Sequence, residues 1–133
     1  MKTYIKYNKP YDVEGMSHLE LGRYGEKIGR DFLEFNNYTI LKTNLRTKFG
    51  EIDIVAKKDN VLAVVEVKTR RTKSYGLPCE AVSRQKQQHI KGSLNWYLQQ
   101  IAGAYTYDIR FDVIEVYVEK QISRVRHLEG CFM

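Results

Sequence analysis

Two strand-like runs joined by a short polar turn constrain this chain more than any other feature. Residues 50–57 and 61–70 alternate in the manner of β-strands, and the KKDN segment between them has the composition of a turn. These runs therefore predict an antiparallel β-hairpin. The second run carries apolar residues on both of its faces, which is typical of a central strand covered from both sides.

Helical periodicity precedes and follows this hairpin. Residues 17–20, SHLE, fit a capping box in which the serine and glutamate side chains satisfy free backbone N–H groups. An apolar stripe continues to Phe35, so we expect a helix from Ser17 to the Asn36-Asn37 pair. A second stripe predicts a helix over about residues 83–101. Further strands are expected at residues 38–44, 107–118 and 121–128.

The order α-β-β-β-α-β-β predicts an α/β fold with a mixed central sheet flanked by helices. A chain of 133 residues, 43% of them hydrophobic, suits one domain with one core. We assign this domain to residues 16–133. Residues 1–15 are rich in Tyr and Lys and show no period, which predicts a flexible N-terminal arm.

The net charge of +6 favours an anionic partner, and nucleic acid is the commonest such partner for a soluble domain. Solubility alone is an equally good reason for this charge. The longest apolar run, residues 61–65, is far too short to cross a membrane, and residues 1–15 lack the apolar stretch of a signal peptide. We interpret the two cysteines as thiols of a reducing compartment. The prediction is a cytoplasmic protein with no membrane contact.

Strand parity brings acidic and basic side chains of the hairpin onto one face. Alternate residues of a strand share a face, so Asp53 lies on the same side as Glu51, and Glu66 lies on the same side as Lys68. A turn of two or four residues within KKDN places Glu51 directly across from Glu66, with Asp53 diagonal to it. Three carboxylates and a lysine therefore converge on one patch.

Like charges across a pair of strands destabilise a sheet unless something compensates them. Lys68 neutralises part of the charge, and a divalent cation neutralises more, because Mg²⁺ and Mn²⁺ prefer oxygen ligands and use few carboxylates plus water. Such a set suits metal-assisted phosphodiester hydrolysis, in which a lysine orients water and stabilises the transition state. The alternative interpretation is a surface hairpin whose polar face meets water.

Five segments of the chain resemble one protein family, in the same order. They are LGRYGEKIGRDFL, GEIDIVA, VVEVKTRR, YGLPCEAVSRQKQQHI and RFDVIEV. Together they resemble the YraN-like family of predicted bacterial endonucleases over nearly all of residues 19–133. Asp53 followed by Glu66-Val67-Lys68 is also similar to the PD-(D/E)xK signature of the restriction-endonuclease-like superfamily, although Ile52 replaces its proline. The chain is similar, within that superfamily, to archaeal Holliday-junction resolvases.

The resemblance implies a restriction-endonuclease-like core and assigns roles residue by residue. Asp53 and Glu66 would be metal ligands, and the Val67 main-chain carbonyl would face the same Mg²⁺ or Mn²⁺. Lys68 would be the catalytic lysine. Glu26 matches an acidic residue on the first helix of the resolvases, and it would assist the metal directly or through water.

Glycines on the first predicted helix allow its backbone, and with it Glu26, to approach the sheet closely. Gly22, Gly25 and Gly29 occupy the arc between Glu26 and the apolar stripe. Each costs about 1 kcal/mol relative to Ala in a helix. We therefore expect the helix backbone to approach a neighbour closely, and the sheet that bears Asp53 is a candidate. From the residues alone, a solvated Glu26 is the alternative.

Basic residues outside the cluster are candidates for phosphate contacts. Arg70, Arg71 and Lys73 suit contacts that position a nucleic-acid backbone without reading bases, and a solvated loop is the alternative. Gln85 and Lys86 lie near the start of the second predicted helix. That end of a helix favours anions, so both side chains are predicted to approach the scissile phosphate.

Two further residues are interpreted as structural. Asp112 is expected to pair with Arg110 or Lys68 rather than to act in catalysis. Trp96 is interpreted as part of the helix packing and not as a platform for bases.

Two functional hypotheses from different classes follow. The first is a divalent-metal-dependent nuclease that hydrolyses DNA, including branched or single-stranded forms. The second is a non-catalytic nucleic-acid-binding module that keeps the fold. The acid–acid–lysine set favours the nuclease, since acids that repel phosphate serve no purpose in a pure binder. A grip on two DNA arms calls for a homodimer, for which the sequence shows no symmetric apolar patch.

Overall fold

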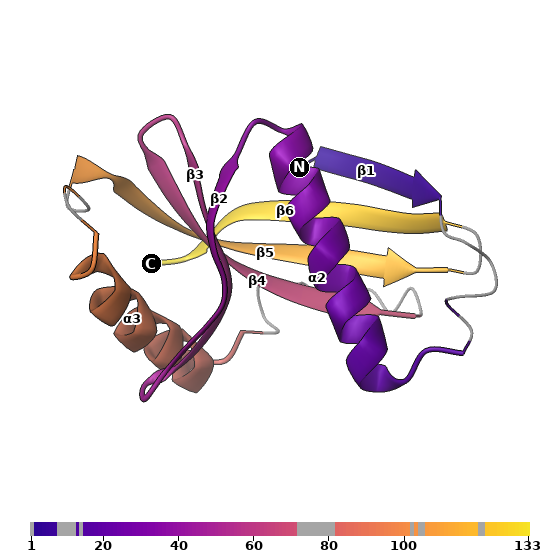
Figure 1. Cartoon of the computed structure of the whole chain (residues 1–133), viewed down its shortest axis with the longest axis horizontal. Helices are drawn as coiled ribbons and strands as arrows, with labels where there is room; N and C mark the ends of the chain where they lie inside the picture. The colour runs from indigo at the N-terminus through magenta and orange to yellow at the C-terminus, as the bar shows by residue number, and fades with distance from the viewer. Residues whose placement is uncertain are drawn as a thin grey trace.

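The computed structural model of the chain describes residues 2–7, 13, 15–71, 82–101, 103, 106–119 and 122–133. Its elements run in the order β1 (Lys2–Tyr7), α2 (His18–Phe35), β2 (Thr39–Thr47), β3 (Gly50–Lys58), β4 (Val61–Arg70), α3 (Arg84–Leu98), β5 (Asp108–Val118) and β6 (Ile122–Phe132). The strands form one sheet in the order β1-β6-β5-β4-β3-β2 (Figure 1). Among the described strands, β4 and β5 are the parallel neighbours, and α3 lies between them in the sequence. The predicted mixed α/β sheet flanked by helices is confirmed.

The first strand, β1, was not anticipated from the sequence. It pairs antiparallel with β6 at one edge of the sheet, where residues 1–15 were expected to form a loosely attached arm. Pairing at an edge uses backbone N–H and C=O groups that any residue except proline supplies. Such a strand needs no alternation of apolar and polar residues, so the sequence pattern did not predict it.

The first helix begins and ends where the sequence predicts. The Ser17 hydroxyl accepts a hydrogen bond from the Glu20 N–H, and the Glu20 carboxylate accepts one from the Ser17 N–H, each at 3.2 Å. This is the expected capping box. At the other end Asn36 is the C-cap, and Asn37 adopts a left-handed φ of 69° that turns the chain into β2.

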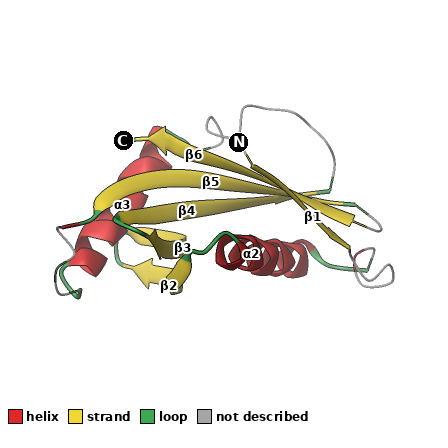
Figure 2. Ribbon diagram, turned by 90° about the horizontal axis from the view of Figure 1, so that it is seen from above, coloured by secondary structure: helices red, strands yellow, loops and turns green. Residues whose placement is uncertain are grey.

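The helices α2 and α3 cover opposite faces of the sheet. Alternate residues of β4 belong to two separate apolar clusters, since Val65 and Val67 pack under α2 whereas Leu62 and Val64 pack under α3. This alternation is what a strand covered on both sides requires. Figure 2 shows α2 on one side of the long strands β4, β5 and β6. The prediction of β4 as a central, covered strand is confirmed.

Two of the three α2 glycines bring this helix onto the sheet. A Cβ added to Gly25 would lie 1.8 Å from Thr69 Oγ1, and one added to Gly29 would lie 3.4 Å from Val67 Cγ2. Gly22 has no such neighbour within 4 Å. The predicted close approach is therefore confirmed at Gly25 and Gly29, and it is directed at the end of β4.

The register of the β3–β4 hairpin differs from the expected one by two residues. Lys58 pairs with Val61, and Asp59-Asn60 form the turn, with Asp59 at a left-handed φ of 53°. The expected position of Glu51 directly across from Glu66 is therefore wrong. A two-residue shift leaves every side chain on its face, so the shared face survives the error.

One interpretation of the cysteines is also wrong. Cys131 on β6 is disulfide-bonded, so it is not a thiol, and Cys79 lies outside the described residues. The cysteines accordingly give no support to a reducing compartment. Among the described helices, none has the length and apolarity that a membrane span requires.

Candidate metal centre

The candidate site lies where β3 separates from β4. The last paired residues of this ladder are Ile54 and Val65, and β3 continues beyond them paired only with β2. At that point Asp53 Oδ2 accepts a hydrogen bond from the Val67 N–H at 2.9 Å. The side chain of Asp53 thus takes the place of a strand partner, and it is held inside the opening between the two strands.

Asp53 and Glu66 form a pair of buried carboxyl groups in this opening. The ladder register, continued by one residue, places them across from each other, and they are 9% and 6% exposed. Burial raises the pKa of Asp53, and the Val67 N–H opposes that shift. Burial and the adjacent Asp53 charge raise the pKa of Glu66 to about 7. Two such neighbours resist simultaneous ionisation, because each negative charge disfavours the other.

Two lysines reach the same oxygen of this pair. Glu66 Oε1 lies 3.7 Å from Lys68 Nζ and 3.6 Å from Lys86 Nζ. Lys68 comes from β4 and Lys86 from the first turn of α3, so the structure brings the predicted helix residue to the cluster. With both carboxyls ionised, the buried Glu66 Oε2 has no hydrogen-bond partner among the described residues; with one of them protonated, the Glu66 and Asp53 side chains hydrogen-bond to each other.

Glu26 approaches the cluster from the other layer of the protein. It follows Gly25, whose contact with Thr69 sets α2 against the end of β4. Burial and the Asp53 charge raise the pKa of Glu26, and a hydrogen bond with the Asn44 side chain opposes the rise. Glu26 is therefore within electrostatic reach of Asp53, and it is half-buried rather than fully solvated.

The other predicted phosphate-binding residues are spread more widely. The Arg71 guanidinium donates hydrogen bonds to the backbone oxygens of Val13 and Met16, at 3.0 Å and 2.6 Å, and so ties the segment before α2 to the end of β4. Arg70 is paired across the sheet with Tyr117 of β5. These positions give Arg71 a structural role that the sequence did not suggest. Gln85 is exposed on the first turn of α3, next to Lys86, and Lys73 lies outside the described residues.

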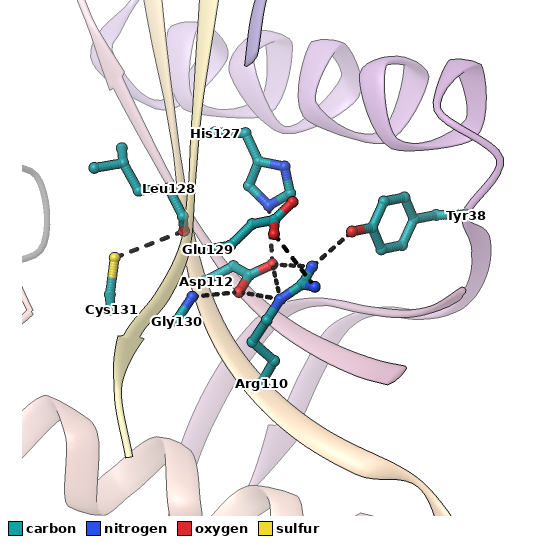
Figure 3. Close-up of polar contacts among 8 residues, drawn as sticks. All are labelled: Tyr38, Arg110, Asp112, His127, Leu128, Glu129, Gly130 and Cys131. Atoms are coloured by element: carbon teal, nitrogen blue, oxygen red, sulfur yellow. Dashed lines mark hydrogen bonds and ion pairs between the residues drawn. The ribbon is translucent and has the colours of Figure 1, made fainter. Parts of the chain in front are cut away.

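A second buried polar network was only partly anticipated. Asp112 is paired with Arg110, as one of the two expected partners, with 2.9 Å between Arg110 Nη2 and Asp112 Oδ2 (Figure 3). Asp112 also accepts hydrogen bonds from His127 Nε2 at 2.9 Å and from the Gly130 N–H at 3.0 Å. Arg110 in turn donates to the Tyr38 hydroxyl at 2.6 Å. The sequence did not indicate this role for His127, because the residue lies on β6, fifteen positions after Asp112.

In this second network the Asp112 carboxylate is fully engaged by described partners, with both of its oxygens accepting hydrogen bonds. Burial alone would raise the pKa of Asp112, but hydrogen bonds from His127, Arg110 and the Gly130 N–H hold it below its usual value. Figure 3 shows the carboxylate of Asp112 enclosed by these partners. The network ties β5, β6 and the start of β2 together, which is a structural task.

The donor set of the first cluster fits a hard divalent cation. Mg²⁺ and Mn²⁺ take oxygen ligands, commonly one or two carboxylates completed by water. Asp53 and Glu66 supply such a pair, and the buried, unpartnered Oε2 of Glu66 is an oxygen that a cation would satisfy. The described residues contain no group of three or more His, Cys, Asp or Glu side chains that could hold a metal by themselves. A cation here would therefore keep part of its water shell.

The fold and this cluster define an α/β domain with an acid–acid–lysine set at a point of strand separation. The chain belongs to the uncharacterised protein family UPF0102, whose family model matches residues 25–116. A UPF0102 protein of Alkaliphilus metalliredigens is 46% identical over 112 residues, which cover 84% of this chain and 96% of that protein. A UPF0102 protein of Caldicellulosiruptor bescii is 38% identical over 119 residues, covering 88% of this chain and 100% of that protein. The matched region contains Glu26, Asp53, Glu66, Lys68 and Lys86.

Proposed function

We propose that this protein is a divalent-metal-dependent nuclease that hydrolyses phosphodiester bonds in DNA. The observation that carries the proposal is the buried Asp53–Glu66 pair, with two lysines on one oxygen of Glu66. Buried carboxylates are costly unless a partner compensates them, and the lysines leave Glu66 Oε2 without one. Binding of a cation and a phosphate would account for this buried carboxyl pair and its two lysines.

Asp53 and Glu66 would hold the cation, which is Mg²⁺ or Mn²⁺, together with the main-chain carbonyl of Val67. When bound, such a cation polarises a phosphoryl oxygen and lowers the pKa of water. The Glu66 carboxyl has a pKa of about 7 and would have to be ionised to act as a ligand. The Asp53 carboxylate is held in position by the Val67 N–H, which supports its role as a ligand.

The surrounding side chains suit phosphoryl chemistry. Lys68 Nζ, 3.7 Å from Glu66 Oε1, is placed to orient the attacking water and to stabilise charge that develops on the phosphorane-like transition state. Lys86 carries a second positive charge to the same point from the N-terminal turn of α3, where a phosphate is also favoured by the helix dipole. Glu26 would assist the metal through water. These roles agree with the similarity to the PD-(D/E)xK superfamily noted in the sequence.

The basic charge of the chain supports nucleic acid as the substrate class. The described part of the chain shows no recognisable base-reading element, so we propose cleavage that depends on DNA form rather than on sequence. The alternative within the same fold is a module that binds nucleic acid without cleaving it.

The test is incubation of the purified protein with labelled duplex, single-stranded, flap and four-way DNA, with Mg²⁺ or Mn²⁺ and with EDTA. We expect metal-dependent cleavage that falls by about 100-fold or more in Asp53→Ala and in Lys68→Ala. Glu34→Gln and Lys27→Ala, which change exposed charges on α2, are the matched controls and should keep full activity.

Two results would count against the nuclease. Binding of DNA without cleavage under either metal favours the binding module. Cleavage that persists in Asp53→Ala points to a different site or to a contaminating enzyme.

A further inference from the structure

The tip of the β2–β3 hairpin is built against α3. Thr47 Oγ1 and Ser93 Oγ are 2.8 Å apart, and a Cβ added to Gly92 would lie 2.9 Å from the Cβ of Phe49. A Cβ added to Gly50 would likewise lie 2.7 Å from the Cβ of His89. Figure 1 shows this hairpin extending away from β4 toward α3. The close contacts hold the backbone at Phe49 on the helix.

Two aromatic side chains are left open on this surface. Phe49 is 45% exposed and Trp96 is 42% exposed, although large aromatic side chains are usually mostly buried. Both line one open pocket with Lys48, and the Lys48 Nζ lies 5.2 Å from the centroid of the Phe49 ring. Trp96 also lines the adjoining pocket with Lys42 and Arg46. The interpretation of Trp96 as helix packing therefore does not account for its exposure.

The charged side chains that residues 39–49 and α3 bring to this surface are all basic, and one of them pairs with an acid of β3, with 3.8 Å between Arg46 Nε and Glu51 Oε2. Residues 39–49 and 84–98 contain no Asp or Glu. Their basic residues are Lys42, Arg46, Lys48, Arg84, Lys86 and Lys91. Exposed aromatic rings among basic side chains suit a polyanion that carries accessible rings of its own, such as a nucleic-acid strand with unpaired bases. They suit an apolar partner poorly.

This surface is continuous with the candidate metal centre. Arg46 lines the pocket beside Trp96 and also a further open pocket that contains Lys86 and His89. Lys86 Nζ lies 3.6 Å from Glu66 Oε1. A series of adjoining pockets therefore leads from Lys86, which contacts Glu66, past Arg46 and Glu51 to the two aromatic rings.

We infer that Phe49 and Trp96 form a stacking platform for unpaired bases of a DNA strand whose backbone enters the candidate metal centre. The inference rests on the proposed function and names its substrate form as single-stranded, or locally unpaired, DNA. Bases of an intact duplex are stacked on one another and offer no free face, whereas an unpaired base can stack on an exposed ring. In this arrangement the basic residues of β2 and α3 contact the phosphates of the strand between the platform and Glu66.

Tryptophan fluorescence tests this assignment directly, because Trp96 is the only tryptophan of the chain. Titration with a dT oligomer in EDTA, where cleavage does not interfere, should quench the emission as bases stack on the indole. An abasic oligomer of the same length carries the phosphates without bases, and it should bind more weakly and quench little. Unchanged emission at a saturating concentration of the dT oligomer overturns the inference.

Substitutions separate stacking from charge. Phe49→Leu and Trp96→Leu should raise the dissociation constant for the dT oligomer by about fivefold or more, and should change duplex binding by less than about twofold. Phe35→Leu alters an exposed aromatic at the far end of α2, and it should leave both affinities unchanged. Circular dichroism and thermal unfolding establish that each variant is folded. Folded Leu variants with wild-type affinity for the dT oligomer contradict the platform.

Failure of the platform and failure of the proposed nuclease are distinguishable. Asp53→Asn should bind and quench as the wild type does, even if no variant cleaves DNA. Retained cleavage of single-stranded DNA by the folded Leu variants at low substrate concentration would remove the platform and keep the nuclease. If sedimentation shows instead that the rings join two copies of the chain and Leu breaks that dimer, the surface is a self-association site.

Discussion

The carboxylate of Asp53 accepts a hydrogen bond from the backbone N–H of Val67, with 2.9 Å between Oδ2 and the nitrogen. This bond lies at the position where β3 leaves β4, so one side chain both closes the end of the ladder and supplies a candidate metal ligand. Structure and candidate chemistry at the site therefore depend on the same side chain.

Asp53→Asn and Asp53→Ala are expected to differ in stability although both remove the charge. Asparagine keeps an oxygen that can accept from the Val67 N–H, whereas alanine leaves this buried donor unpaired, at a cost of about 1–3 kcal/mol. Urea unfolding at pH 8 in EDTA should therefore rank Asp53→Asn above Asp53→Ala. Equal free energies of unfolding for the two variants would show that the hydrogen bond contributes nothing.

Glu66→Gln is expected to stabilise the protein at pH 8 when no divalent cation is present. The pKa of Glu66 is raised from 4.5 to about 7 on folding, so between these values the folded state binds more protons than the unfolded state. Its contribution to the free energy of unfolding therefore declines as the pH rises through that window. Thermal melts in EDTA should place Glu66→Gln about 3 °C or more above the wild type at pH 8, with the difference closing toward pH 5. A lower melting temperature for the variant at pH 8 would assign Glu66 a stabilising role.

Binding of Mn²⁺ is expected to release protons near neutral pH. A carboxyl group with a pKa of about 7 is partly protonated there, and the cation binds only the ionised form. Titration calorimetry at pH 6.5 in buffers with different ionisation enthalpies should give different apparent enthalpies. Glu66→Gln should lose the proton release together with most of the affinity, and Glu34→Gln should keep both. Absence of Mn²⁺ binding to the wild type would refute the metal centre.

Gly25→Ala and Gly22→Ala form a matched pair on α2. Alanine is intrinsically better than glycine in a helix by about 1 kcal/mol, and Gly22 has nothing within 4 Å of an added Cβ, so Gly22→Ala should stabilise the protein. An added Cβ on Gly25 would lie 1.8 Å from Thr69 Oγ1, so Gly25→Ala must displace α2 from β4 and should destabilise it by about 1–3 kcal/mol. Chemical denaturation of both variants measures the difference, and the same sign for both would contradict the contact.

Asp112→Asn is expected to destabilise the fold without touching the candidate metal centre. The substitution leaves the partly buried Arg110 with only the exposed Glu129 carboxylate, 3.5 Å away, as an anionic partner, and breaking a buried pair of this kind costs about 3 kcal/mol or more. Because the pKa of Asp112 is held low, its stabilising effect is present at neutral pH and is lost as the pH falls below the ordinary aspartate value. Urea unfolding at pH 7 and pH 3 tests both statements. A loss below about 1 kcal/mol at pH 7 would show that the network is dispensable.

The local elements could be predicted because their signals are local. The capping box at Ser17, the Asn36-Asn37 end of α2 and the run of β4 from Val61 to Arg70 each depend on residues a few positions apart. The shared face of Asp53, Glu66 and Lys68 also followed from strand parity. The hairpin register did not, because a shift of two residues preserves parity and the exact turn was decided by Asp59 in a left-handed conformation.

The sequence by itself determined which residues face together on each strand and helix, since that depends only on backbone periods of 2.0 and 3.6 residues. Only the tertiary structure decided that β3 leaves β4 beside Asp53, that Lys86 reaches Glu66, and that His127 closes on Asp112. These relationships join distant parts of the chain, and they arise from how two helices and a twisted sheet pack. The burial that raises the pKa of Glu66 likewise belongs to the packed core, which no single segment contains.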